Sequence, residues 1–327
     1  MKSRRSVADA VHDAARRLDQ AGVVFGHGTV DALQESTWLA AHVLRKSWNE
    51  VVAASQAPID PAAEAAIGEL VAQRIATRKP AAYLMNEAWL GPHRFYVDER
   101  VIVPRSFIAE LLRTDRPPGL LFERPRSLPG SGPESGVRTI LDLCTGSGCL
   151  AILAALACTR AQVDAADLSQ DALDVARRNV DDYALGGRVR LVRSDLFAAL
   201  GLRRYDLIIS NPPYVKAAAM KRLPREYRGE PVMALASGAD GLDHVRVILA
   251  QARRHLNPGG LLVVEVGHNR KALEKAFPGL PFAWPKTSGG RNFVFTLAAE
   301  SLSPQDASPG ESGAAGSNRG KQRGRRD

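Results

Sequence analysis

From residue 137 onward, strands and helices alternate along the chain, and this alternation restricts the possible folds more than any other sequence feature. Short β-branched or apolar runs, each suited to one buried strand, are separated by apolar segments with helical spacing. We predict strands at 139–143, 163–166, 189–192, 206–210 and 261–265, and helices at 149–158, 172–180 and 244–255. Repeated βα units predict a parallel, doubly wound α/β sheet that binds its ligand at the carboxyl ends of the strands.

The end of this region predicts a closing hairpin. Aromatic and β-branched runs at Phe282–Trp284 and Phe293–Thr296 flank the turn-forming Ser288-Gly289-Gly290. Together with the preceding strands, this pair predicts a Rossmann-like sheet of seven strands.

The amino-terminal region has a different pattern. Ala- and Leu-rich segments place apolar residues at helical spacing, and Asp60-Pro61 is typical of a helix start. After residue 80 the pattern changes to Phe95–Val97 and Val101–Val103, separated by a polar triplet, which predicts a β-hairpin.

These patterns divide the chain into five parts. Residues around 117–133 are rich in Pro, Gly, Ser and Arg, which is typical of a linker, and the last 25 residues lack apolar anchors, so we expect them to be disordered. The predicted parts are an amino-terminal helical domain (1–80), a β-hairpin connector (81–114), a linker (115–136), an α/β domain (137–302) and a disordered basic tail (303–327).

Charge, cysteines and apolar runs exclude several classes. The net charge of +9 suits an acidic partner, but part of it lies in the tail, where such charge is more often solvated. The cysteines fall in one apolar stretch and the histidines are scattered, so we expect no metal site. The longest apolar run, 149–158, has about half the roughly 20 residues of a membrane span, and no apolar leader follows the basic start. We expect a cytoplasmic protein without a membrane segment.

A glycine-containing loop follows the first strand of the sheet. Cys144-Thr145-Gly146-Ser147-Gly148 leads directly into a helix, and its glycines let the backbone approach a ligand. The pattern Gly146-x-Gly148-x-x-Ala151 also satisfies a dinucleotide-binding fingerprint. The loop alone therefore leaves the cofactor open.

Acidic residues at successive strand ends favour S-adenosylmethionine. Asp142 precedes the loop, where it can attract the cationic sulfonium or the amino group of this cofactor. Asp167, followed by Leu168, is placed to accept ribose hydroxyls, and Asp195-Leu196 is placed to contact adenine. For Asp142 alone, the alternative is a carboxylate that caps the loop.

The strand at 206–210 delivers Asn211-Pro212-Pro213-Tyr214 to the same edge. Two prolines stiffen the turn, so that the Asn211 side-chain oxygen and the Pro212 carbonyl are fixed acceptors for both hydrogens of an NH2 group. Tyr214 can stack on a planar substrate and orient its nitrogen for methyl transfer. In isolation the motif would be a capped turn; after this strand and loop we expect a methylation site.

Several planar nitrogens fit such a site, including glutamine and asparagine amides and the amines of adenine, cytosine and guanine. Residues 80–300 resemble the protein-(glutamine-N5) methyltransferase family, in the branch that acts on the large-subunit ribosomal protein numbered three. The resemblance lies in Ala82–Leu84, Asn86–Trp89, Phe95–Val101, Val103–Ser106, Asp142–Gly148, Leu223-Pro224, Glu226-Tyr227, Glu230-Pro231, Leu235–Gly238, Asp240–Leu242 and Glu265–Gly267. The release-factor branch is expected to have Pro-Arg-Pro where this chain has Pro104-Arg105-Ser106.

The resemblance implies roles for individual residues. Cys144–Gly148, Asp167, Leu196 and Asn211 would bind S-adenosylmethionine, and Asn211–Tyr214 would hold the glutamine amide. The amino-terminal helices would dock the protein substrate. Trp89, Arg105 and Glu230 would contact the substrate chain, or else form ordinary interdomain packing.

Other functions are compatible with parts of the sequence. Release factors or a nucleic-acid base are alternative substrates, ribosomal RNA of assembling particles is an additional candidate partner, and a non-catalytic RNA-binding assembly factor is a rival of another class.

Overall fold

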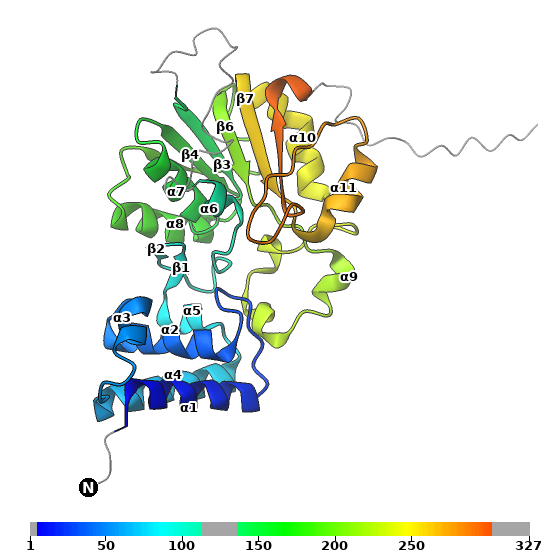
Figure 1. The fold of residues 1–327 in the computed structure, drawn as a ribbon. Helices are drawn as coiled ribbons and strands as arrows, with labels where there is room; N and C mark the ends of the chain where they lie inside the picture. The colour runs from blue at the N-terminus through cyan, green and yellow to red at the C-terminus, as the bar shows by residue number, and fades with distance from the viewer. Residues whose placement is uncertain (1–4, 113–135, 303–327) are drawn as a thin grey trace, which may run out of the picture.

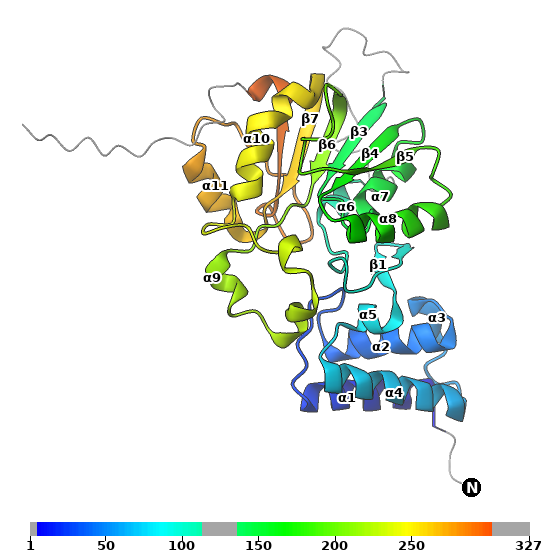
Figure 2. The same cartoon turned by 180° about the vertical axis from the view of Figure 1, so that it is seen from behind.

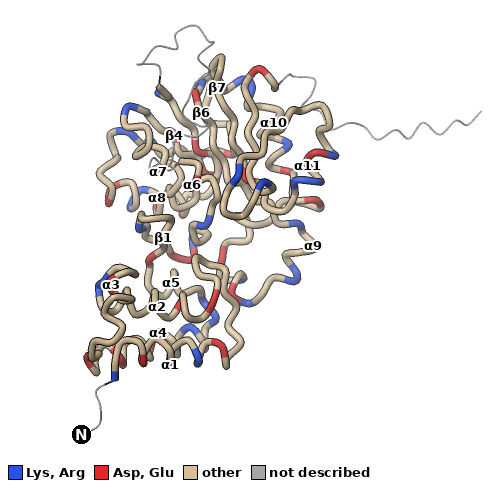
Figure 3. The backbone as a smooth tube through the Cα atoms, viewed as in Figure 1, with Lys and Arg blue, Asp and Glu red and all other residues tan. Residues whose placement is uncertain are grey.

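The computed structural model describes residues 5–112 and 136–302. A small helical part and a larger sheet part lie one above the other, joined through a hairpin (Figures 1 and 2). The predicted linker, except Gly136, and the predicted tail lie outside the described residues. Acidic and basic positions are interspersed over both parts (Figure 3).

The amino-terminal part is helical, as its apolar spacing predicts. Its helices are α1 (Val7–Gln20), α2 (Ala32–Leu44), α3 (Trp48–Ala53), α4 (Pro61–Thr77) and α5 (Ala81–Met85). Ser6 and Asp9 form a capping box at the start of α1, whereas Asp60 makes no side-chain capping bond before Pro61. The core includes Leu18, Leu39 and Val71, all fully buried. Burying each such side chain contributes about 1.5–3 kcal/mol.

A short hairpin follows, at a different position from the predicted one. Its strands are β1 (Ala88–Leu90) and β2 (His93–Phe95), with Ala88 opposite Phe95. The prediction of strands at 95–97 and 101–103 is wrong, because none of these residues except Phe95 lies in a strand.

Side chains from distant elements satisfy the backbone of this irregular segment. Asn179 Oδ1 accepts from the Tyr96 amide at 2.7 Å, and the Glu230 carboxylate accepts from the Val103 amide at 3.0 Å. Val97, Val101 and Val103, which alternate as in a strand, are nevertheless buried. Their spacing therefore correctly marks core positions but does not specify strand pairing, which depends on available backbone partners.

The sheet part contains six strands in the order β5-β4-β3-β6-β7-β8. All neighbours are parallel except β7 and β8. The strands are β3 (Thr139–Leu143), β4 (Gln162–Asp167), β5 (Val189–Arg193), β6 (Tyr205–Ser210), β7 (Leu256–Glu265) and β8 (Val294–Ala298). The helices are α6 (Ile108–Leu111), α7 (Cys149–Ala157), α8 (Gln170–Asp182), α9 (Ala217–Met220), α10 (Asp243–His255) and α11 (Arg270–Ala276). Short 3-10 turns span Arg225–Gly229, Val232–Ala234, Gly267–Asn269 and Ala299–Ser301.

Alternate residues of the central strands form two separate cores. Ile140 and Leu207 pack with α7 on one face, while Leu141 and Ile208 pack with α10 and α11 on the other. This is the period-2 alternation of a strand buried on both faces.

The predicted seventh strand is replaced by a single bridge. Ala283 pairs with Thr296 through two backbone hydrogen bonds, and no longer ladder forms in the described segment. Pro281 and Pro285 bracket this position and have no N–H to donate, which limits the pairing. The count of seven strands is therefore corrected to six, within the predicted Rossmann-like class.

The strand order places the site. Going along the chain, β4 and β5 are added on one side of β3, whereas β6 and β7 are added on the other. The loops after β3 and β6 diverge at this switch point, and ligands of such sheets bind in the crevice beside it. None of the described helices is long and apolar enough to cross a membrane.

Candidate active site

A cavity opens at the carboxyl ends of β3, β4, β5 and β6. It brings together most of the predicted cofactor residues: Cys144, Gly146, Asp167, Leu168, Asp195, Leu196 and Asn211, together with Pro213. Arg100–Ile102 from the irregular connector and His244 from the start of α10 also line it. The sequence did not single out these last residues for the cofactor site, because they reach the cavity only through the tertiary fold; Arg100 and Val101 were marked only as part of the family resemblance.

The loop after β3 takes a conformation that its glycines permit. Gly146 has φ +55°, and a Cβ added there would meet no atom within 4 Å, so space beside its backbone is open. Gly148 has φ +78°, and a Cβ there would lie 3.1 Å from Ala176 Cβ. The first glycine thus gives a ligand access to the backbone, and the second allows α7 and α8 to pack closely. This geometry fits the predicted nucleoside cofactor.

Asp167 lies at the end of β4 beside that loop. One oxygen accepts from the Gly146 amide and the other from the Ser169 amide, each at 2.9 Å. Burial raises the pKa of this carboxyl above its ordinary value. Each oxygen keeps a further lone pair, so the group can still accept from ribose hydroxyls.

Asp142 lies behind the loop and does not line the cavity. It is fully buried, and its Oδ2 accepts from the Thr145 hydroxyl at 2.5 Å and from the Ala151 amide at 3.0 Å. Burial raises its pKa to about 7. Thr145 and Ser147 are likewise buried. These contacts agree with the loop-capping alternative, and a direct cofactor contact by Asp142 stays a prediction.

The register of β6 delivers the Asn-Pro-Pro-Tyr turn beside the loop. Ser210 lies opposite Leu143, and its hydroxyl donates to the Leu143 carbonyl at 2.9 Å, so Asn211 follows immediately at the cavity. Pro212 and Pro213 are buried. The Asn211 Oδ1 atom is buried, and none of the described residues donates a hydrogen bond to it. A buried acceptor without a donor costs free energy unless a ligand satisfies it.

Several residues that the sequence did not single out for the site hold Tyr214 in place. The Asn269 side-chain amide donates to the Tyr214 carbonyl at 2.8 Å. A Cβ on Gly267 would lie 2.7 Å from Tyr214 Cε2, and one on Gly241 would lie 2.4 Å from the Tyr214 carbonyl oxygen. Burial, followed by the charge of Glu265, raises the pKa of Tyr214 well above its ordinary value. The phenol is therefore neutral at physiological pH.

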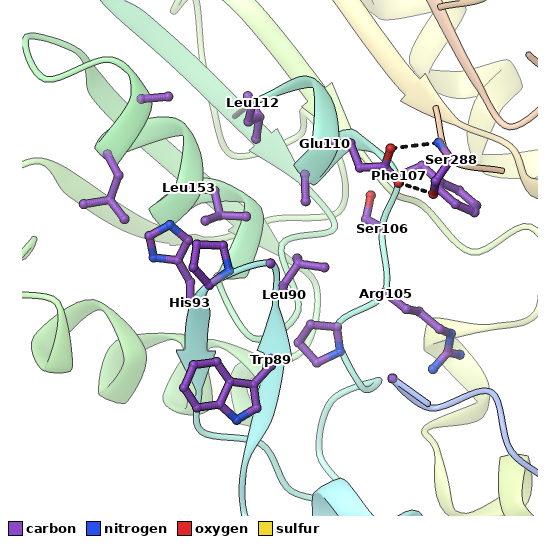
Figure 4. Close-up of a pocket in the computed structure, with 17 residues that line it drawn as sticks. Trp89, Leu90, His93, Arg105, Ser106, Phe107, Glu110, Leu112, Leu153 and Ser288 are labelled. Carbon is purple, nitrogen blue, oxygen red and sulfur yellow. Dashed lines mark hydrogen bonds between the residues drawn. The ribbon is translucent and has the colours of Figure 1, made fainter. Parts of the chain in front are cut away.

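A second, larger cavity of about 690 Å³ forms a groove between the β1–β2 hairpin and the later segment Pro104–Phe107. Trp89 lies on the hairpin side, and Arg105, Ser106 and Phe107 run along the other (Figure 4). The Trp89 side chain is 43% exposed, and its Nε1 donates to Glu87 at 2.8 Å. The ring therefore presents an apolar face to the groove while its polar atom is bonded.

Arg105 and Glu230 form an ion pair with each other. Two guanidinium nitrogens donate to the carboxylate at 2.5 and 2.7 Å. Burial alone would raise the pKa of Glu230, but the hydrogen bonds from Arg105, together with the His27 ring 3.7 Å away, outweigh it and hold the pKa at about 2. Arg105 lines the groove and Glu230 does not. Glu230 thus makes packing contacts with Val103 and Arg105, and contact of either Arg105 or Glu230 with a substrate chain stays a prediction.

The sheet, the glycine loop and the Asn-Pro-Pro-Tyr turn define a methyltransferase with an added helical part. Accordingly, residues 132–225 match the model of the methyltransferase small domain, and residues 9–85 match that of the PrmC N-terminal domain. The chain is 47% identical to the ribosomal protein uL3 glutamine methyltransferase of Neisseria meningitidis, over 91% of this chain and 94% of that protein. It is 48% identical to the enzyme of the same name from Burkholderia pseudomallei, over 91% and 96%.

The chain therefore belongs to the family of the ribosomal protein uL3 glutamine methyltransferases, which confirms the predicted resemblance. Among solved structures, a methyltransferase from Pyrococcus furiosus is similar with a TM-score of 0.37 and 21% identity, over 49% of this chain and 74% of that one.

Proposed function

We propose that this protein methylates the side-chain nitrogen of a glutamine in the large-subunit ribosomal protein uL3, with S-adenosylmethionine as methyl donor. The proposal rests on family membership and on one atom of the site. Asn211 Oδ1 is a buried acceptor without a donor among the described residues, at the edge of the cofactor cavity. A primary amide supplies the missing N–H.

The substrate amide must be oriented because its lone pair is delocalised into its own carbonyl. Asn211 Oδ1 accepts one amide N–H and the Pro212 carbonyl accepts the other, which aims the lone pair toward the donor. Tyr214 stacks on the amide plane, and its ring is held in place by Gly267. The bound cofactor supplies a methyl group on a sulfonium, which is intrinsically reactive toward nucleophiles.

The residues of the first cavity would hold the cofactor. The open space beside Gly146 would take its amino acid part, Asp167 would accept from its ribose hydroxyls, and Leu196 would contact its adenine. Cys144, Leu168 and Asp195 complete the wall of this cavity. Asp142 supports this arrangement from behind by fixing Thr145 and the start of α7.

The uL3 chain docks against the amino-terminal helices and runs along the groove toward Tyr214. Trp89 offers an apolar face there, and Arg105 offers a charged edge. Since the proposed substrate is a ribosomal protein, we expect the reaction to take place in the cytoplasm.

The test is methyl transfer from labelled S-adenosylmethionine to purified uL3, to a release factor and to ribosomal RNA in separate reactions. We expect label on one glutamine of uL3, located by mass spectrometry. Asn211→Ala should lower kcat by about 100-fold to 1,000-fold, as the loss of one preorganised hydrogen-bonding group does. Asn292→Ala, at an exposed position, is the matched control and should leave kcat unchanged. Label only in the release factor or only in RNA would overturn the proposal, and failure to bind the cofactor would favour a non-catalytic binding protein.

A further inference from the structure

Glu265 is a buried carboxyl group that the mechanism above does not use. It is the last residue of β7, one position beyond Val264, which lies opposite Ser210. Asn211 directly follows Ser210, so Glu265 ends β7 at the same level of the sheet as the Asn-Pro-Pro-Tyr turn. Glu265 is only 2% exposed. A carboxyl group in such a place requires compensating hydrogen bonds.

Its known donors come from the wall of the groove. The Ser106 hydroxyl donates to Glu265 Oε2 at 2.6 Å, and the Phe107 amide donates to the same oxygen at 2.9 Å. Ser106 Oγ in turn accepts from the Ile108 amide at 3.2 Å. Ser106 and Phe107 both line the groove, as Figure 4 shows. Glu265 therefore fixes the backbone of this wall from behind.

The strand end that carries Glu265 also lies against Tyr214, through Gly267. After burial, the charge of Glu265 is the largest influence that raises the pKa of Tyr214. The other supports of this tyrosine act elsewhere: Asn269 binds its carbonyl, and Gly267 lies against one edge of its ring. Glu265, two residues before Gly267, thus ties the wall of the groove to the strand end that lies against the tyrosine ring.

We propose that Glu265 is a positioning residue that holds Tyr214 and the Pro104–Phe107 wall of the groove in one fixed relation. A substrate chain lying along the wall then meets the tyrosine in the orientation that methyl transfer requires. This inference rests on the proposed function and extends it. It also gives Ser106 a physical role, because its hydroxyl is one of the groups through which the wall is attached.

The kinetic test compares Glu265→Gln with the wild type, using uL3 as substrate. The variant keeps the shape of the side chain and one carbonyl oxygen for Ser106 and Phe107, but it cannot carry the negative charge that the wild-type carboxyl bears above its raised pKa of about 7, so the assay is run above that pH. We expect kcat to fall by about 10-fold to 100-fold, the range for losing a hydrogen bond to a charged group, with unchanged affinity for S-adenosylmethionine. Glu274→Gln, on α11 and paired with Arg270, is the control and should match the wild type.

A second measurement needs no substrate. Tyrosine labelled with 13C at Cζ is incorporated into the full chain, and the signal missing from Tyr214→Phe assigns Tyr214. Its ionisation is then followed by NMR at alkaline pH. Glu265→Gln should lower the pKa of Tyr214, because a neighbouring negative charge is removed while Arg105 and Glu230, the other charged groups near it, remain.

The outcomes separate the two proposals. Wild-type protein that methylates no glutamine would refute the proposed function, whereas an unchanged Tyr214 titration or an unchanged kcat in Glu265→Gln would overturn the positioning role. A variant that loses cofactor affinity along with kcat would also count against it, since the role assigned to Glu265 lies on the substrate side.

Discussion

Gly267→Ala tests whether the orientation of Tyr214 controls the reaction. Gly267 has φ +53°, where a side chain costs about 1–2 kcal/mol. The new Cβ would also lie 2.7 Å from Tyr214 Cε2, against an ordinary contact of at least 3.4 Å, so the ring must move by about 0.7 Å. Such overlap costs a further 1–3 kcal/mol, roughly, and we expect total destabilisation of about 2–5 kcal/mol.

Displacement of this size should lower kcat by about 100-fold, because reacting groups misplaced by about 1 Å lose that much. Affinity for S-adenosylmethionine should stay unchanged, since Tyr214 does not line its cavity. Steady-state kinetics, calorimetry and denaturant unfolding measure these three quantities.

Gly201→Ala is the matched control for backbone strain. Gly201 has φ +60°, but a Cβ there meets nothing within 4 Å. It should therefore show the strain of about 1–2 kcal/mol and full activity. If both variants lost kcat equally, or if Gly267→Ala kept the wild-type kcat, the argument that ring placement governs catalysis would be refuted.

Three further predictions concern the cofactor loop, the groove and pH. Gly146→Val should weaken S-adenosylmethionine binding by at least about 10-fold in calorimetry, because its side chain occupies the open space beside the loop; unchanged binding would place the cofactor elsewhere. Arg105→Ala should abolish methylation with cofactor binding retained, and should cost about 3–5 kcal/mol in urea unfolding because it leaves Glu230 buried without its partner; unchanged turnover would remove Arg105 from the site. Burial raises the pKa of Glu265 from 4.5 to about 7, so the folded protein binds this proton more tightly and stability falls as pH rises through this window. Glu265→Gln should reduce the slope of stability against pH, and the part of the slope that comes from the raised pKa of Asp142 should remain. An unaltered slope would contradict the raised pKa of Glu265.

Local sequence patterns predicted the structure least well where strand pairing depends on residues that are distant in the chain. Val97, Val101 and Val103 alternate as in a strand and are buried, yet Asn179 and Glu230 take the backbone bonds of the segment. At Phe282–Trp284 the apolar pattern is correct, but the flanking prolines leave one bridge. In both places, burial was predictable and hydrogen bonding was not.

The sequence alone determined the βα alternation, the glycine loop and the position of Asn-Pro-Pro-Tyr at the end of a buried strand, because periodicity and turn chemistry act over a few neighbouring residues. Only the tertiary structure decided what supports that turn. Gly267 and Asn269 reach Tyr214 across more than 50 residues, and Glu265 reaches Ser106 across 159. Such contacts depend on strand order and register, which bring distant segments together without leaving a local pattern in the chain.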